Sequence, residues 1–547
     1  MRTTGSHLTS AARIGLAACV TAVLVAGCTS DSGESGSRDA APTDRAIPSF
    51  TYAIATMPTS LSGITTKIQT RLITSLVTEP LERVSYVDGA IKYTPRLALA
   101  VQEPDPLTQV YTIRSGVKFS DGTPLTAEDV AWSMNAAAAP TAETAANLEN
   151  FAGATATGPL QVTVKWKNPV IHPRLTGNVN VLQAKFAEAH SKDLGTPGAL
   201  PIGTGPYMYE AQTSQDITLV PNPHYWGTRP KVETVKFTVI SLDTSGQLAM
   251  RAGSIQGTRV IDLKTAAQWK EVPGASLHAS RELASDLLSM DTSKPPFDDI
   301  HVRKAVAHSI DRKGILEAAF GGYADRLKTL VPVGEISSVA PSVDAAQSFV
   351  DRLPQYELDT QKAKQELAQS AFPDGFSVEV PYINTSVWEK LLLLNLQENM
   401  APLGVTITLQ PVPWGEWFQT FFSHQATGIQ LLNEFSTPDP DPSGLLWGLV
   451  GEQTMKPNFP NGANFTTPAV EGAWPALNPA TAAKFNRQQR WEATQTILTE
   501  VANQVPYVPL FSKQAVYVLA DGYTFTQSPT FFDVNFGSWI DFLRSTR

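Results

Sequence analysis

The sequence predicts a mixed α/β fold with α+β portions, and three observations lead to this prediction. Segments that alternate apolar and polar residues, as strands do, are interleaved along the chain with segments of helical periodicity. One strand, helix and strand unit, residues 376–412, has a crossover long enough for a parallel pair of strands. At 547 residues the chain is longer than one ordinary core, so two or three domains are expected.

The first residues have the features of an export signal. Arg2 and Arg13 precede an apolar run, residues 14–26, which is shorter than the roughly 20 residues that a membrane-spanning helix needs. We therefore expect residues 1–27 to be a signal peptide that is removed from the mature protein.

The end of this signal, "VAGC", resembles the lipobox of bacterial lipoproteins, in which the cysteine, here Cys28, becomes the lipidated first residue. The alternative is a plain signal peptide in which Cys19 and Cys28 are incidental. Cleavage before Cys28 would leave one thiol, which excludes an intramolecular disulfide and a cysteine-based zinc site. Residues 28–47 are small, polar and turn-forming, which indicates a flexible tether to a membrane surface.

The charge of the mature chain argues against a nucleic acid partner. Removing residues 1–27 deletes two arginines and no acids, so the formal net charge moves from -9 to -11. An acidic protein without a basic patch in its sequence lacks the electrostatic attraction that nucleic acid binding requires.

The first half of the chain is predicted to be rich in strands. Thr126 and Asp129 have the form of a capping box and predict a helix over 127–137. "PIGTGPY", residues 201–207, predicts a sharp backbone reversal. The alternating segments predicted as strands are "FTYAIAT" (50–56), "VYTIRSGVKF" (110–119), "LQVTVKW" (160–166), "DITLV" (216–220) and "VETVKFTVI" (232–240).

The second half of the chain is predicted to be richer in helices. Val302, Val306, Ile310 and Leu316 recur near helical spacing, after a possible N-cap at Asp298 or Asp299. Further helices are predicted over 359–375, where Pro-Asp-Gly is the stop, over 387–404 and over 487–504, with strands at 376–382, 405–412 and 505–511.

The sequence contains no recognisable catalytic or cofactor motif. It lacks HExxH, GxxxxGK[ST], GxGxxG and GxSxG. His301 and His308 would lie about 10 Å apart on one helix, too far to share a metal ion. We therefore expect binding without turnover: no enzyme, no cofactor and no metal site.

Several stretches together resemble the family 5 solute-binding proteins of ABC importers, a family that includes dipeptide-, oligopeptide- and nickel-binding proteins. They run from about Phe50 to the C-terminus, and the most specific are "SGVKFSDGTPLTAEDV", "GTGPY" and "NPHYWG". The resemblance implies a clamshell like the type II periplasmic binding proteins: two lobes joined by crossing strands, with an additional inserted domain. Domain I would comprise 48–76, 201–288 and 512–547, domain II 77–200, and domain III 289–511.

The resemblance also implies a function. The protein would be an extracytoplasmic, monomeric receptor, anchored to the cell membrane by lipid on Cys28. It would capture di- or oligopeptides and deliver them to an ABC permease and its ATPase subunits. The alternative is the same fold binding an oligosaccharide, a metal chelate or haem.

In peptide-binding members an acid in the second lobe pairs with the amino terminus of the peptide, and an ungapped carry-over from Trp417 puts Asp439 there. Pro438 and Pro440 would hold its backbone extended, while the following Asp441 resembles a structural "DP". A solvated proline-rich turn is the alternative, with Ser436 or Pro438 as rival occupants of the anchor position.

Two features depart from the family pattern. Glu434 and Phe435 stand where members often have Gly-Trp, and no arginine lies between Glu416 and Asp441 to meet a peptide carboxylate. The remaining predicted ligand-binding residues are Trp414 and Trp417, as pocket walls or as core; Phe435; and Ala55, Thr56 and Met57, where the first lobe offers its backbone.

Overall fold

The computed structural model describes residues 42–65, 67–87, 90–425, 428–436, 439–537 and 539–547. The predicted signal peptide, Cys28 and the tether up to residue 41 lie outside the described residues. The end of the tether packs on the folded body, because Thr43 pairs with Ser545 and Ile47 is buried beside Val232. Within the described ranges, no helix is both long and apolar enough to cross a membrane.

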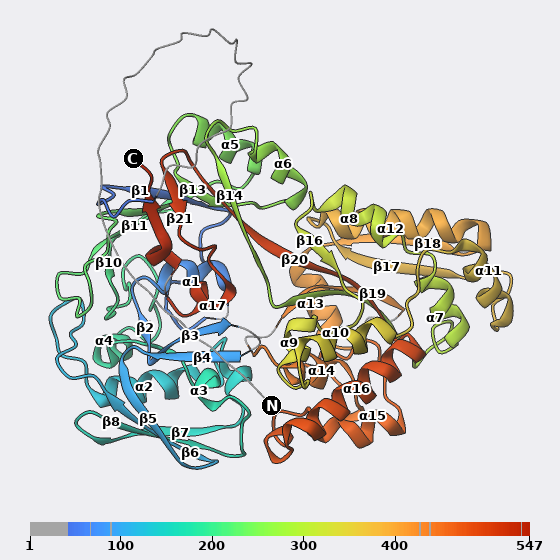
Figure 1. Ribbon diagram of the computed structural model, residues 1–547, viewed down its shortest axis with the longest axis horizontal. Helices are drawn as coiled ribbons and strands as arrows, with labels where there is room; N and C mark the ends of the chain where they lie inside the picture. The colour runs from blue at the N-terminus through green and yellow to red at the C-terminus, as the bar shows by residue number, and fades with distance from the viewer. Residues whose placement is uncertain (1–41, 66, 88–89, 426–427, 437–438, 538) are drawn as a thin grey trace, which may run out of the picture. The chain divides into compact units, whose positions relative to one another are not determined.

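The mixed α/β class is confirmed, and the largest sheet has ten strands from segments far apart in the sequence (Figure 1). β1 is parallel to β12 and β13, whereas the other pairs of this sheet are antiparallel. In spatial order the strands are β10 (Tyr207–Gln212), β11 (Asp216–Pro221), β12 (Val235–Val239), β1 (Phe50–Ile54), β13 (Gly257–Arg259), β20 (Tyr507–Leu519), β15 (Ala284–Met290) and β19 (Ile429–Ser436), with β14 (Ser276–Arg281) and β16 (Ala324–Arg326) also paired to β20.

β20 runs through both halves of this sheet. Residues 507–511 pair with β15, and residues 514–519 pair with β14, the strand that directly precedes β15. The two antiparallel chain segments therefore cross together from one half of the sheet to the other (Figure 1). They correspond to the crossing strands that the family resemblance implies.

A separate four-stranded sheet carries helix α2 on one face. α2 (Ala127–Ala137) has the predicted bounds, and its capping box is present: the Thr126 hydroxyl accepts from the Asp129 N–H, and the Asp129 carboxylate accepts from the Thr126 N–H. The strands of this sheet are β5 (Ala98–Asp105), β6 (Thr108–Ile113), β8 (Gln161–Trp166) and β7 (Phe151–Gly158).

Four two-stranded sheets complete the strands of the described residues. They are β2 (Glu79–Pro80) with β9 (Asn180–Val181), β3 (Glu82–Val87) with β4 (Ala90–Pro95), β17 (Ser377–Ile383) with β18 (Thr406–Val412), and β21 (Tyr523–Phe525) with β22 (Leu543–Ser545). β17 and β18 are parallel and flank α12 (Val387–Met400), so the predicted strand, helix and strand unit is confirmed.

Helices cover both faces of β15 and β19. Leu287 and Leu432 pack in one core, against α13 and α16, whereas their neighbours Leu288 and Leu431 pack in a second core against α7 and α12. Two covered faces explain why every residue of β15 is buried. The helices of this part are α7 (Ile300–Ala307), α8 (Arg312–Ala319), α9 (Val333–Ser337), α10 (Val343–Arg352), α11 (Thr360–Gln369), α13 (Trp414–Phe422), α14 (Pro442–Leu449), α15 (Pro468–Ala473) and α16 (Arg487–Gln504).

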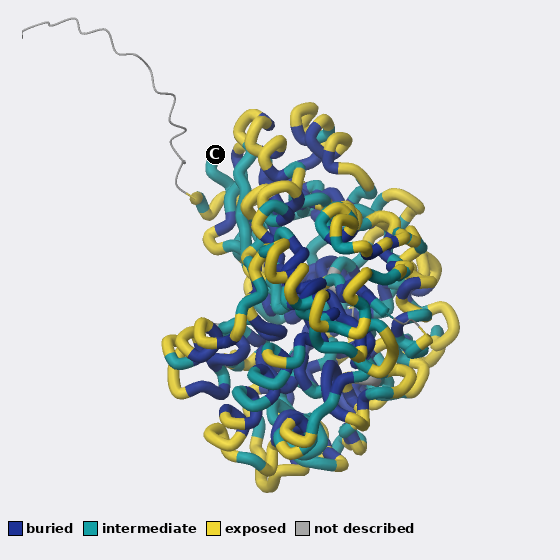
Figure 2. Tube along the Cα trace, turned by 90° about the vertical axis from the view of Figure 1, so that its right-hand side faces the viewer, coloured by how far each residue is buried: buried dark blue, intermediate teal, exposed yellow. Residues whose placement is uncertain are grey.

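The remaining helices surround the other half of the ten-stranded sheet and the four-stranded sheet. They are α1 (Ile68–Thr74), α3 (Pro173–Thr176), α4 (Ala184–Ala189), α5 (Asp243–Arg251), α6 (Ala266–Trp269) and α17 (Phe531–Asn535). Figure 2 shows buried segments in the interior and exposed segments mainly at the outer loops.

The helical pattern predicted across Val302–Leu316 is divided into α7 and α8. His308 ends α7, and the Asp311 side chain accepts from the Gly314 N–H as the N-cap of α8. A capping aspartate inside a helical pattern favours a new helix start over continuation, because its side chain satisfies the first N–H groups.

The predicted reversal at 201–207 brings backbone against backbone. A Cβ at Gly203 would lie 2.0 Å from the Val77 carbonyl oxygen, and one at Gly205 would lie 2.6 Å from it. Only glycine fits at both positions, which accounts for the "GTG" spacing.

Candidate ligand-binding site

A cavity of about 560 Å³ lies where four distant segments meet, within residues 63–71, 137–180, 439–480 and 535–536. Such a volume is in the range of about 300–1,000 Å³ that small-molecule sites occupy. Four aromatic side chains line it: Trp447, Phe459, Trp474 and Phe536.

Asp439 lines this cavity and is paired with His172, which follows the lining residue Ile171 but does not itself line the cavity. The His172 Nδ1 atom lies 2.8 Å from Asp439 Oδ1, and both side chains are about a quarter exposed. Burial acts to lower the pKa of His172, but the Asp439 carboxylate outweighs it and raises the pKa above its ordinary value. Burial in turn raises the pKa of the Asp439 carboxyl. The Asp439 carboxylate thus favours the protonated form of His172.

Asp441 has a structural role two residues further on. It is the N-cap of α14: its carboxylate accepts from the Ser443 N–H at 2.9 Å, and Pro442 occupies the first helical position. The same carboxylate forms an ion pair with Arg490, and both side chains are buried. This agrees with the structural "DP" that the resemblance implies.

Glu434 occupies a position at which the family resemblance leads us to expect glycine. Its φ is +52°, in the left-handed region, at a shift in the pairing of β15 with β19. Two contacts offset the strain: the Glu434 N–H donates to Asp286 at 2.7 Å, and its carboxylate lies 3.0 Å from the Lys513 ammonium.

The other predicted site residues do not line the large cavity. Trp417 is buried in the core and stacks on Phe421, whereas Trp414 is 59% exposed. Phe435 is half-buried against the same core as Trp417. The side chain of Ser436 lies outside the described residues.

The three residues after β1 also lie away from the cavity lining. Thr56 is exposed, and its carbonyl accepts a hydrogen bond from the Gln69 side chain at 2.9 Å. Ala55 and Met57 are half-buried, and Met57 packs against the core beneath β1.

The sequence indicated neither Arg71, which lines the cavity, nor His172, which is paired with Asp439. His172 and Asp439 are 267 positions apart, and Arg71 contacts Asn535 across 464 positions. No local pattern marks either residue, so only the fold brings them together.

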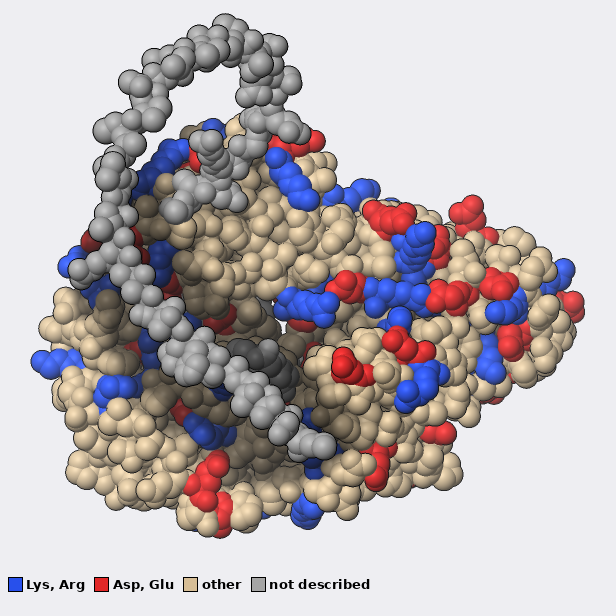
Figure 3. All heavy atoms as spheres, viewed as in Figure 1, with Lys and Arg blue, Asp and Glu red and all other residues tan. Residues whose placement is uncertain are grey.

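No metal site is evident among the described residues. They contain no group of three or more His, Cys, Asp or Glu side chains placed to hold a metal ion. Figure 3 shows basic and acidic side chains interspersed on one face of the molecule.

Comparison with known proteins gives the family. Residues 92–457 match the model for bacterial extracellular solute-binding proteins, family 5. The glutathione-binding protein GsiB of Salmonella paratyphi A is 28% identical over 324 residues, covering 57% of this chain and 59% of that protein. The heme-binding protein A of Haemophilus influenzae is 25% identical over 374 residues, covering 66% and 64%. The chain thus matches less than two thirds of the length of both relatives.

Solved structures share the fold over nearly the whole chain. The periplasmic binding protein DppA of Helicobacter pylori, in complex with the peptide STSA, has a TM-score of 0.73 at 18% identity and covers 92% of this chain and 99% of its own. The substrate-binding protein CtaP of Listeria monocytogenes has a TM-score of 0.75 at 20% identity and covers 92% and 100%. Proteins of this family are extracytoplasmic solute-binding components of ABC transporters. The chain belongs to the bacterial extracellular solute-binding proteins of family 5.

Proposed function

We propose that this family 5 protein captures di- or oligopeptides outside the cytoplasm and delivers them to an ABC permease and its ATPase. In this proposal it is a monomer tethered to the cell membrane by lipid on Cys28, it catalyses no reaction, and its ligand leaves unchanged. The division into domains I, II and III stays part of this proposal.

The cavity at Asp439 is the observation that supports the proposal most directly. Its volume of about 560 Å³ suits a small molecule or a peptide of a few residues. Asp439 stands in its wall as a carboxylate that can accept from a peptide ammonium. DppA of Helicobacter pylori, with the same fold, is bound to a tetrapeptide, and GsiB takes its name from glutathione, a tripeptide.

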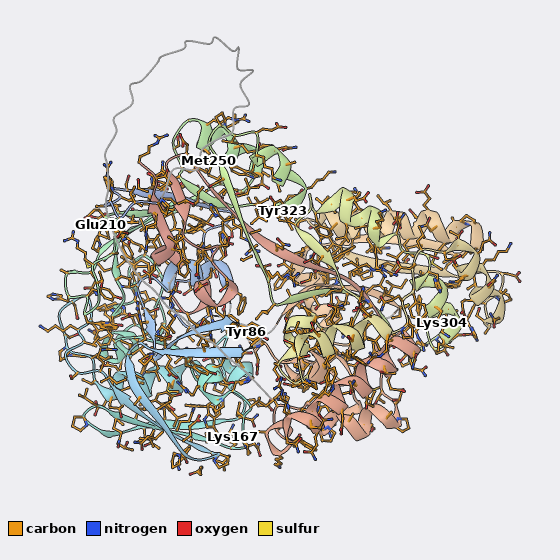
Figure 4. The ribbon with its side chains drawn as sticks, in the orientation of Figure 1. Tyr86, Lys167, Glu210, Met250, Lys304 and Tyr323 are labelled. Atoms are coloured by element: carbon orange, nitrogen blue, oxygen red, sulfur yellow. The ribbon has the colours of Figure 1, made fainter. Side chains whose placement is uncertain are left out.

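Because His172 already faces Asp439, the ligand ammonium has to share or displace that contact. Away from the cavity lining, the hydroxyl of Tyr86, a residue labelled in Figure 4, donates to the Gly334 carbonyl at 2.9 Å and joins β3 to α9. We propose that ligand binding is coupled to the contact between His172 and Asp439, since Asp439 lines the cavity.

A second candidate is an oligosaccharide, a metal chelate or haem. The lining favours it in one respect, because Trp447 and Trp474 offer flat surfaces for a ring and seven asparagines offer neutral hydrogen bonds. The relationship to heme-binding protein A points in the same direction.

Thermal unfolding of the purified protein with candidate ligands separates these proposals. A ligand that binds only the folded state raises the melting temperature, by an amount set by its concentration relative to its Kd. We expect a rise with peptides. A rise with oligosaccharides, chelates or haem, and none with any peptide, would reject the peptide proposal.

The role of Asp439 is tested by Asp439→Asn, with the exposed Asp344→Asn as the matched control. Calorimetric titration with a bound peptide should show about 10- to 100-fold weaker binding for Asp439→Asn, because a charge-assisted hydrogen bond becomes a neutral one. The control should bind as the wild type does. Equal affinities for all three proteins would remove Asp439 from the site.

A further inference from the structure

Arg71 projects from α1 into the wall of the large cavity. Two hydrogen bonds fix its guanidinium: Nε donates to the Thr65 carbonyl at 2.7 Å, and Nη1 donates to Asn535 Oδ1 at 3.1 Å. The Asn535 amide is itself oriented, because its Nδ2 donates to the Phe531 carbonyl at 2.7 Å. The guanidinium is therefore held in one position before any ligand arrives.

Both acceptors of Arg71 are neutral. Among the described residues, no carboxylate forms an ion pair with this guanidinium. Burial lowers the pKa of Arg71 to about 10, and no nearby charge counteracts it. A partly buried charge without a counterion is costly unless a partner arrives from outside the chain.

Arg303 shows what distinguishes a structural arginine. Burial also lowers its pKa to about 10, but its guanidinium donates to three backbone carbonyls, those of Phe297, Asp298 and Gln504, and it does not line the cavity. Arg71 differs from Arg303 because it lines the cavity and has only two neutral acceptors, so it can bind a ligand.

The other charges of the lining add to the positive potential. Lys167, labelled in Figure 4, and Lys456 also line the cavity, and neither forms an ion pair within the described part of the chain. The acids of the lining are Glu149 and Asp439, of which Asp439 already faces His172. The cavity of this acidic protein thus carries an excess of basic groups.

We propose that Arg71 is the carboxylate-binding residue of the cavity. The ligands are then small molecules with at least one carboxylate that the pair of Asp439 and His172 does not neutralise and that binds Arg71. The planar guanidinium matches a carboxylate geometrically, and Lys167 and Lys456 add attraction at longer range. If the ligand is a peptide, as the proposed function states, the group that Arg71 binds is the C-terminal carboxylate. Arg71 would supply the arginine that is missing between Glu416 and Asp441.

The test uses the purified full chain and matched probes. One pool contains tripeptides built from Ala, Leu, Phe, Ser and Lys as free acids, and a second pool contains the same tripeptides as C-terminal amides. Citrate is the carboxylate probe that is not a peptide, and maltotriose is the uncharged probe. Melting temperatures are compared for the wild type, Arg71→Gln, Arg71→Lys and the exposed control Arg229→Gln.

We expect the acid pool to raise the melting temperature of the wild type and the control, and the amide pool to raise it much less. Titration with a binding tripeptide should be about 10- to 100-fold weaker for Arg71→Gln. Arg71→Lys, which keeps the charge but not the fork, should fall between the two. If Arg71→Gln does not fold, Arg71→Lys and the comparison of acids with amides still test whether Arg71 binds the ligand carboxylate.

The outcomes separate the two proposals. If acids and amides stabilise all variants equally, the role of Arg71 is wrong and peptide binding stands. If citrate stabilises the wild type but not Arg71→Gln, and neither peptide pool does, the role of Arg71 stands and peptide binding fails. If only maltotriose stabilises the protein, or no carboxylate does, the role of Arg71 is overturned.

Discussion

Replacing Asp441 should unfold the protein far more readily than replacing Asp439, although the two aspartates are two residues apart. Asp441 is 2% exposed and caps α14, and its partner Arg490 is 8% exposed. Asp441→Ala removes the cap, which costs about 1 kcal/mol, and leaves a buried guanidinium unpaired, which costs about 3–5 kcal/mol. The sum of about 4–6 kcal/mol is a large part of the roughly 5–15 kcal/mol that stabilises a typical native protein.

Two further variants separate the cap from the ion pair. Asp441→Asn retains a side chain that caps well, so it should lose only the ion-pair contribution of about 3–5 kcal/mol. Adding Arg490→Met to Asp441→Asn removes the stranded charge and should restore most of that loss. Both are expected because the ion pair is buried and its attraction is not screened by water.

Urea titrations followed by tryptophan fluorescence measure these differences. Trp491 reports on this region because it lies next to Arg490 in the sequence and is buried in the same core as the leucines of α14. Free energies of unfolding that are additive for the single and double variants would refute the reasoning. A loss below about 1 kcal/mol for Asp441→Asn would refute it as well.

Three other predictions concern stability. Burial acts to lower the pKa of His172, but Asp439 outweighs it and raises the pKa, so this contact stabilises fully below pH 6.5 and is lost as the pH rises through the raised value. The wild type should therefore lose about 1–2 kcal/mol of unfolding free energy between about pH 6 and about pH 9 that His172→Gln does not lose. Equal losses in urea titrations of the two proteins would contradict this. Burial raises the pKa of Glu335 to about 7 from 4.5, so the stability of the folded protein falls as the pH rises between these values. Glu335→Gln should avoid this loss of about 3 kcal/mol between about pH 4 and about pH 8, and parallel pH profiles of stability for the variant and the wild type would contradict this prediction. Trp417→Ala should cost about 3–5 kcal/mol and the exposed Trp414→Ala less than about 0.5 kcal/mol, measured by thermal unfolding; the opposite order would contradict this burial.

Features decided within a few residues could be predicted from the sequence. The capping box at Thr126 gives the start of α2. The start of α14 was not predicted, although Asp441 followed by proline is a local signal for it. The division between α7 and α8 was missed because the apolar spacing continues through it, although Asp311 was there to mark it.

Features that depend on distant contacts could not be predicted in this way. Asp439 was singled out by resemblance, but its partner His172 comes from another part of the fold, and its sequence context does not distinguish it from the other histidines. Arg71 lies in a helix whose sequence gives no reason to expect a cavity, and the Asn535 that orients it comes near the end of the chain. Such pairs depend on which segments the sheets bring together.

The position of β20 has a consequence for how the protein is made. This strand is central to the ten-stranded sheet, yet it comes from residues 507–519, after nearly all the other strands have been synthesised. Neither half of the sheet can therefore reach its final form while the ribosome is still translating the preceding residues. The two halves also cannot be produced as separate fragments without giving each its own copy of that strand.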